Sequence, residues 1–194
     1  YREANSRYGS GLFMQTGEIA KLKDTIESFN ISPSPILITG EYGTGRSGAA
    51  AYIYTHSKYR KKSFIEIDCS MLNDKSCDFL LNSIKSPFYL NGYTIHIMNM
   101  DQCSEERLNE LINSLNFISV CENNHVIFSG NPESHPFSAH VKYLQDKFQC
   151  FTIALKPLRE IKDQIPAIIN YYLSSLKKNP NDTGCRIDRH AMVI

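Results

Sequence analysis

The stretch Pro35-Ile-Leu-Ile-Thr-Gly-Glu-Tyr-Gly-Thr-Gly-Arg-Ser47 decides the fold, because it joins a buried strand to a helix through a glycine-rich loop. Residues 36–39 form a brief apolar run, which is typical of a strand buried on both faces of a parallel sheet. Residues 46–57 are rich in alanine and predict a helix. The pattern between them is G-x-x-x-x-G-K-[ST] with Arg46 in place of the lysine. The sequence therefore predicts a phosphate-binding loop.

The glycines of this loop allow backbone turns that direct N–H groups toward an anion, and the following helix adds the positive end of its dipole. Ser47 has a hydroxyl where such loops supply a ligand to Mg²⁺. We expect the following residues to contact a bound phosphate group: Gly40, Glu41, Tyr42, Gly43, Thr44, Gly45, Arg46 and Ser47. The alternative is a glycine-rich turn that binds nothing.

Arg46 changes the chemistry of the loop. A lysine ammonium is a compact point charge that fits between phosphates, whereas a guanidinium is planar and bulkier. Arg46 keeps the charge, but it fits less well beside a γ-phosphate held in transfer geometry. A long cationic side chain can also fold back over an empty anion site. Arg46 as an internal occupant of the phosphate site therefore stays open.

Short apolar runs alternate with helix-like stretches along the rest of the chain. The predicted strands are residues 36–39, 63–68, 94–98, 126–129 and 150–154. The predicted helices are residues 16–29, 46–57, 74–84, a stretch capped by Ser104, and 159–178. This alternation predicts an α/β fold with a doubly wound parallel sheet of about five strands flanked by helices. We expect the α/β domain over residues 1–156 and the truncated start of a small helical subdomain over residues 157–194.

Composition excludes several classes of protein. The chain has 194 residues and a formal net charge of +1, which gives no general reason to expect binding to a nucleic-acid backbone. No apolar run approaches the ~18 residues that a membrane helix needs. The six cysteines show no C-x-x-C pair and no zinc-type spacing, so free buried thiols in a reducing cytosol are expected. No signal peptide is visible and the last residues are apolar, so we expect a cytoplasmic piece of a longer protein.

Four blocks of sequence together resemble a known family. They are Ser10-Gly-Leu-Phe-Met14, the loop at residues 35–47, Ser63-Phe-Ile-Glu-Ile-Asp-Cys-Ser-Met-Leu72, and Thr152-Ile-Ala-Leu-Lys-Pro-Leu-Arg-Glu-Ile-Lys-Asp-Gln-Ile-Pro166. The chain resembles the bacterial enhancer-binding proteins, which are AAA+ activators of sigma-54 RNA polymerase. The resemblance implies a P-loop NTPase fold of the AAA+ type, a helical lid subdomain after residue 156, and ATP or ADP as the ligand. It also implies a sensor role for Asn131 at the nucleotide.

The chain departs from the family pattern where hydrolysis would be performed. The family's acidic pair after the third strand falls on Met98 and Asn99, so both carboxylates are missing. Asp101, just downstream, is a candidate catalytic residue only if the strand end is rearranged; the alternative is that it caps the helix that starts near Ser104. The arginines that act on a neighbouring subunit's nucleotide fall near Val141 and Lys147. Phosphoryl transfer depends on such charges, so we expect hydrolysis to be weak or absent.

The resemblance also sets expectations about partners. The "G-A-F-T-G-A" loop with which the family contacts the sigma factor is missing from residues 73–93, so sigma-factor contact is not expected. Self-association through AAA+ subunit interfaces is possible, and DNA contact is expected only through a downstream region that this chain lacks. No membrane partner is expected.

Three hypotheses therefore follow from the sequence. The first is a regulatory AAA+ domain of a bacterial transcriptional regulator that binds ATP or ADP without useful hydrolysis. The second is a working ATPase in which residues such as Asp101 and Glu41 handle Mg²⁺ and water. The third is a nucleotide-free oligomerisation scaffold.

Overall fold

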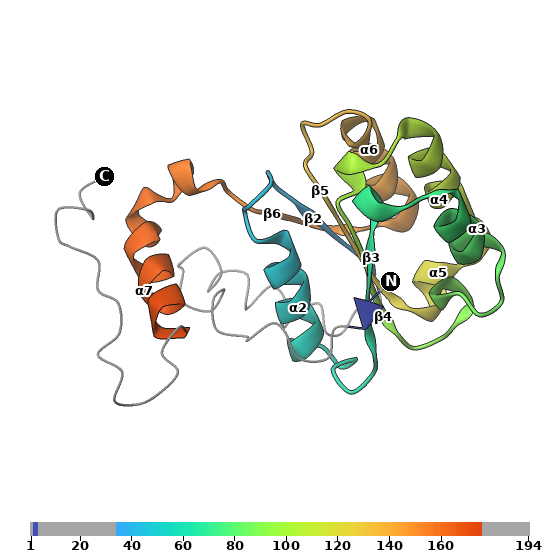
Figure 1. The fold of residues 1–194 in the computed structure, drawn as a ribbon, viewed down its shortest axis with the longest axis horizontal. Helices are drawn as coiled ribbons and strands as arrows, with labels where there is room; N and C mark the ends of the chain where they lie inside the picture. Colours follow the sequence, from blue (N-terminus) through green and yellow to red (C-terminus); the bar gives the residue numbers. More distant parts are fainter. Residues whose placement is uncertain (1, 4–33, 176–194) are drawn as a thin grey trace.

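A computed structural model describes residues 2–3 and 34–175 of the chain, and its centre is a six-stranded sheet (Figure 1). Five strands are parallel: β2 (Ile36–Thr39), β3 (Phe64–Asp68), β4 (Thr94–Met98), β5 (His125–Gly130) and β6 (Phe151–Ala154). The short β1 (Arg2–Glu3) pairs antiparallel with β3 at one edge. The spatial order is β1-β3-β4-β5-β2-β6.

The path of the chain reverses at β2. From β2 the chain crosses to β3, returns through β4 and β5, and then adds β6 on the other side of β2. Thr39 at the end of β2 lies in register with Gly130 and Ala154, so the carboxyl ends of these strands meet at one edge. In open α/β sheets, ligands bind at such a reversal point, outside the carboxyl ends of the strands.

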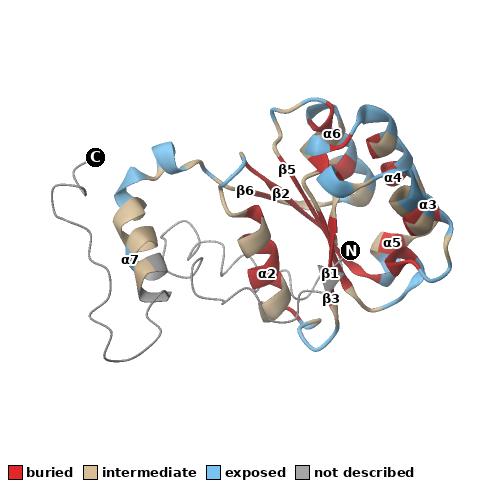
Figure 2. Ribbon diagram, viewed as in Figure 1, coloured by how far each residue is buried: buried red, intermediate tan, exposed pale blue. Residues whose placement is uncertain are grey.

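Helices cover both faces of the sheet (Figure 1). On one face α2 (Arg46–His56) packs its buried alanines and Ile53 against Ile36 and Ile38. On the other face lie α3 (Asp74–Asn82), α4 (Glu105–Phe117), the short α5 (Val120–Asn123) and α6 (Phe137–Phe148). The strands between the two layers are the most buried part of the molecule (Figure 2). Burial on both faces explains why the strands read as continuous apolar runs.

The parallel strands agree with the prediction: each begins and ends within one residue of its predicted bounds. Helix α4 is also confirmed: Ser104 accepts a hydrogen bond from the N–H of Arg107 at its start. The predicted helices at 46–57 and 74–84 end slightly earlier, at His56 and Asn82. The predicted helix at residues 16–29 lies outside the described residues.

The predicted helix over residues 159–178 is wrong at its start. Residues there form two 3₁₀ turns, η5 (Leu158–Glu160) and η6 (Lys162–Gln164), and α7 (Ile165–Ser175) begins only afterwards. Pro166 accounts for the difference, because it has no N–H to donate to a preceding turn and is tolerated only in the first turn of a helix. Helix α6 was missed, although Phe137, Val141, Leu144 and Phe148 have helical spacing.

Among the described helices, none has the length and apolar character required to span a bilayer. The proposed division at residue 156 remains a prediction. Strand β6 ends at Ala154 and α7 follows it, but residues 176–194 lie outside the described part of the chain.

Candidate functional site

The loop between β2 and α2 has a backbone conformation that depends on glycine. Gly43 and Gly45 have φ angles of 85° and 92°, in the region that other residues adopt only with strain. A side chain at Gly40 would place its Cβ 2.7 Å from Thr44 Oγ1, which is too close. Thr44 itself closes a turn, since its Oγ1 donates to the carbonyl oxygen of Glu41 over 2.8 Å. The backbone N–H of Gly40 ties the loop to β5 through the carbonyl oxygen of Gly130.

Helix α2 begins directly at the end of this loop. Gly45 is its N-cap and supplies no side-chain hydrogen bond, and the first turn contains no acidic residue. The first backbone N–H groups of a helix have no partner within the helix. Together with the positive end of the helix dipole, these N–H groups form a site suited to an anion such as a phosphate.

Arg46 is buried and ion-paired inside the protein. Its side chain is 6% exposed, and Nη1 lies 2.9 Å from Oδ1 of Asp101, whose side chain is 8% exposed. The same nitrogen donates to the carbonyl oxygen of Gly40 over 3.2 Å, and Nη2 donates to Oδ1 of Asn99 over 3.3 Å. The cation of the loop therefore points to the carboxyl end of β4 and is neutralised there.

The partners of Arg46 belong to a wider polar network along this edge of the sheet. Asn99 donates from Nδ2 to Oδ1 of Asp68, at the end of β3. Asp101 accepts a second hydrogen bond from the backbone N–H of Asn131, over 3.0 Å, just after β5. Asn99 has a left-handed backbone with φ of 55°, which asparagine tolerates. This sharp turn precedes the 3₁₀ turn η4 (Met100–Gln102), which carries Asp101 back toward Arg46.

The capping role considered for Asp101 is wrong. Ser104 caps α4, and Asp101 binds Arg46 and Asn131 instead. The sensor candidate Asn131 does lie at this edge, but it reaches Asp101 through its backbone. Its side-chain Oδ1 accepts a hydrogen bond from the N–H of Glu133. Sequence reasoning missed Asp68 and Asn99; their positions at the ends of neighbouring parallel strands were the signal that could have found them.

The donors at this edge do not fit Mg²⁺ well. Mg²⁺ binds to oxygen ligands in octahedral geometry and is usually held by one or two carboxylates. Asp101 is held by a guanidinium, so a divalent ion at its Oδ1 would compete with Arg46. Ser47, the predicted metal ligand, is half-buried at the start of α2. Within the described part of the chain, no group of three or more His, Cys, Asp or Glu residues could hold a metal ion.

A second ion pair joins the loop to the segment after β6. Glu41 binds the guanidinium of Arg159, which lies in η5, through both of its oxygens; one of these contacts measures 2.8 Å. The hydrogen bond and charge of Arg159 lower the pKa of Glu41, so the carboxylate is ionised at neutral pH. Tyr42, between the two ends of the loop, is 84% exposed. Glu41 therefore contacts another part of the protein, and Tyr42 lies open to solvent.

Part of the chain, including the loop between β2 and α2, is similar in sequence to known proteins. Residues 12–84 match the model of the sigma-54 interaction domain family. A signal-transduction and transcriptional-control protein of Clostridium beijerinckii is 41% identical over 58 residues, which cover 30% of this chain and 9% of that protein. UacR of Escherichia coli K12, named as a uric acid sigma-54-dependent transcriptional regulator, is 26% identical over 179 residues, covering 79% of this chain and 30% of UacR. The chain thus spans less than a third of either relative.

Structural comparison supports the same fold. NtrX from Brucella abortus, in a crystal structure with ATP, matches with a TM-score of 0.73 and 14% identity over 92% of this chain and 46% of NtrX. The P-loop NTPase domain of an Escherichia coli sigma-54 activator matches with a TM-score of 0.50 and 17% identity, over 72% of this chain and 95% of that domain. The FIGL-1 AAA domain with ADP matches with a TM-score of 0.54 and 16% identity, over 98% of this chain and 66% of that chain. Identities this low show the fold alone, a parallel sheet flanked by helices that this chain shares with these AAA and P-loop NTPase structures.

Proposed function

We propose that the chain is the AAA+ regulatory domain of a sigma-54-dependent transcriptional regulator, and that it binds ATP or ADP without hydrolysing it. The match of residues 12–84 to the sigma-54 interaction domain supports this proposal. The observation that carries this proposal is the ion pair between Arg46 and Asp101 beside an intact glycine loop. The glycine-rich loop offers donors to a phosphate, while the carboxylate of Asp101 is neutralised by Arg46.

Binding would use the backbone more than the charge of Arg46. The glycine-rich turn and the first N–H groups of α2 offer donors to the phosphate oxygens. The guanidinium of Arg46 is already held by three protein oxygens, on Gly40, Asn99 and Asp101. Affinity should therefore depend on the shape of the loop and only weakly on divalent ions.

The absence of hydrolysis follows from the charges that phosphoryl transfer needs. A P-loop NTPase holds Mg²⁺ with a serine or threonine and a carboxylate, and it positions the attacking water with a further polar residue. Strand β4 ends at Met98 and is followed by Asn99, and neither residue carries a carboxylate. The second hypothesis, an ATPase using Asp101 and Glu41, would require both residues to leave their arginine partners.

One observation favours a nucleotide-free scaffold as the alternative. Arg46 is hydrogen-bonded to three protein oxygens, one of them on the carboxylate of Asp101, so the loop needs no ligand to neutralise its cation. In that case the site would serve to hold the loop against β4. The same fold would then contribute to self-association only.

The proposal extends to partners through the family. We expect self-association through the surfaces that AAA+ domains use, and DNA contact through a part of the protein outside this chain. The sigma-factor loop of the family is missing from residues 73–93, so this domain should regulate without contacting the sigma factor.

A binding experiment separates the hypotheses. Saturating ADP at 100 times its Kd should stabilise the chain by ~2.7 kcal/mol, which is a rise in Tm of roughly 5–10 °C for a domain of this size. We expect that rise with ADP and ATP, equal in Mg²⁺ and in EDTA, and no phosphate release. No rise at millimolar nucleotide supports the scaffold. Phosphate release that depends on Mg²⁺ supports the ATPase.

A further inference from the structure

Two cysteines lie side by side at the carboxyl ends of β3 and β4. Cys69 begins the 3₁₀ turn η2 (Cys69–Met71), and Cys103 directly follows η4; the two turns pack against each other. Both cysteines are reduced and buried, with exposures of 3% and 5%. Their side chains are hydrogen-bonded to each other. They belong to one apolar cluster, which brings together residues that are far apart in the sequence.

The surroundings make the two thiols chemically unequal. The hydrogen bond from Cys69 lowers the pKa of Cys103 to about 7, and the charge of Arg107 and the N–H of Ser104 act in the same direction against burial. The same hydrogen bond and burial raise the pKa of Cys69. Because the thiolate is the nucleophilic form, Cys103 is the reactive member at neutral pH and Cys69 is its proton-bearing neighbour.

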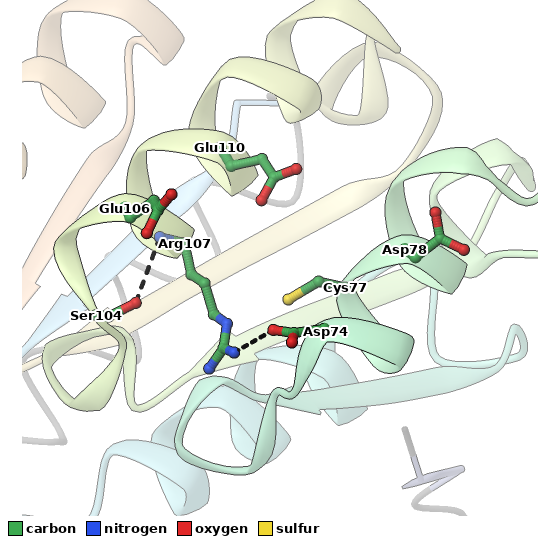
Figure 3. A pocket seen from close by; sticks show the side chains of 7 residues that line it. All are labelled: Asp74, Cys77, Asp78, Ser104, Glu106, Arg107 and Glu110. Carbon is green, nitrogen blue, oxygen red and sulfur yellow. Dashed lines mark hydrogen bonds and ion pairs between the residues drawn. The ribbon is translucent and has the colours of Figure 1, made fainter.

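The solvent-filled space nearest to this pair in sequence lies between α3 and α4, and neither Cys69 nor Cys103 lines it. An open pocket of about 380 Å³ lies between these helices, and Cys77, Ser104 and Arg107 are among the residues that line it (Figure 3). Ser104 directly follows Cys103 in the chain. Arg107 extends from α4 across the pocket to Asp74 at the start of α3 and donates to the carbonyl oxygen of Leu72 (Figure 3). The pocket therefore ends at Ser104, the residue next to Cys103, and an oxidant would have to pass this residue to reach the thiol.

We propose that Cys69 and Cys103 are an oxidisable pair that forms a disulfide when the protein meets a hydroperoxide. The Cys103 thiolate attacks one peroxide oxygen, the O–O bond breaks, and the leaving hydroxide takes up a proton to give water. The resulting sulfenic acid of Cys103 is then attacked by the sulfur of Cys69, whose proton leaves with the hydroxyl group as a second water. Two thiols and one hydrogen peroxide thus give one disulfide and two waters.

The disulfide would restrain η4, the turn that holds Asp101 against Arg46 of the glycine-rich loop. A disulfide requires the two sulfurs to approach to about 2.05 Å, which is a short movement for thiols that are already hydrogen-bonded. It would join η2 to η4, and η4 carries Asp101, the partner of Arg46. The proposal does not depend on whether nucleotide binds.

The test is disulfide mapping on the full chain. The reduced protein is treated with stoichiometric hydrogen peroxide, free thiols are blocked with N-ethylmaleimide, and peptides are identified by mass spectrometry. We expect a peptide that links Cys69 to Cys103, a Tm several degrees higher than that of the reduced protein, and reversal of both by dithiothreitol.

Variants identify the two roles. In Cys69→Ser, Cys103 should stop at the sulfenic acid, which dimedone traps, and the rise in Tm should be lost. Cys150→Ser is the matched control, because burial raises the pKa of Cys150 to about 12 and its loss should leave the linked peptide unchanged. Peroxide treatment of the wild-type chain that yields no such peptide, or mainly a bond from Cys77 to Cys103, overturns the proposal.

Discussion

Nη1 of Arg46 lies 2.9 Å from Oδ1 of Asp101, although the two residues are 55 positions apart in the sequence. Both side chains are more than nine-tenths buried. The arginine stands in the glycine-rich loop between β2 and α2, and the aspartate stands just beyond the end of β4. The pair therefore joins two parts of the proposed nucleotide site and neutralises both charges.

Breaking this pair should destabilise the protein strongly. In Asp101→Asn the guanidinium of Arg46 stays buried without a counter-charge, which costs about 3–5 kcal/mol when one partner of a buried pair is removed. Urea unfolding measures the loss. The control is Asp74→Asn, which breaks the exposed pair with Arg107 and should have a much smaller effect. Equal effects of the two substitutions would show that the burial of Arg46 is not decisive.

The conformation of the glycine loop should control nucleotide binding. Gly43→Ala forces a non-glycine residue to a φ of 85°, where the added Cβ meets no atom within 4 Å, so the cost is backbone strain of about 1–2 kcal/mol. ADP affinity measured by calorimetry should fall at least tenfold. Gly92→Ala, at a φ of 79° away from the loop, introduces the same strain and should leave ADP affinity unchanged. A similar loss of ADP affinity in both variants would mean that backbone strain anywhere in the domain weakens binding, and that the conformation of the glycine loop has no special role.

Acid should weaken the fold through His125. Burial, and to a smaller extent the charge of Lys58, lowers the pKa of His125 from 6.5 to about 4. Between these pH values the unfolded chain binds a proton that the folded chain does not, so stability falls as the pH drops from 6.5 toward 4 and is unaffected above 6.5. The loss amounts to roughly 3 kcal/mol.

The variant His125→Phe isolates this effect, because it keeps an aromatic ring against Tyr59, which stacks on His125 at 5.0 Å. Urea unfolding at several pH values should give a shallower fall below pH 6.5 than in the wild type. An unchanged pH dependence would assign the acid sensitivity to other groups.

The ion pair between Glu41 and Arg159 should order the segment after β6 more than it stabilises the whole domain. In Glu41→Gln the backbone amides of residues 158–164 should exchange hydrogen faster, while Tm changes little, because the pair lies at the surface. Glu160→Gln is the control, since it removes a neighbouring charge without touching the loop. Unchanged exchange in Glu41→Gln would show that the segment is held by packing alone.

The parallel strands and helix α4 were predictable because each depends on a local pattern. A short apolar run bounded by turn residues is typical of a strand buried between two layers, and Ser104 before an apolar helical face predicts a helix start. The predicted helix at 159–178 was wrong at its start because the pattern of apolar residues was weighted above Pro166. The conformation of this segment depends on Pro166, which has no backbone N–H to donate, and the spacing of apolar residues carries no information about that.

The parallel sheet, the position of the glycine-rich loop and the lack of a carboxylate at Met98 and Asn99 could be read from the sequence, because these are properties of residues adjacent in the chain. Only the tertiary structure decided that Arg46 binds Asp101 and Asn99, and that Cys69 meets Cys103. Strand order brings the ends of β2, β3, β4 and β5 to one edge, and the turn at Asn99 then aims Asp101 at the loop. Contacts between side chains so far apart in sequence depend on strand order and backbone turns, and no local pattern encodes them.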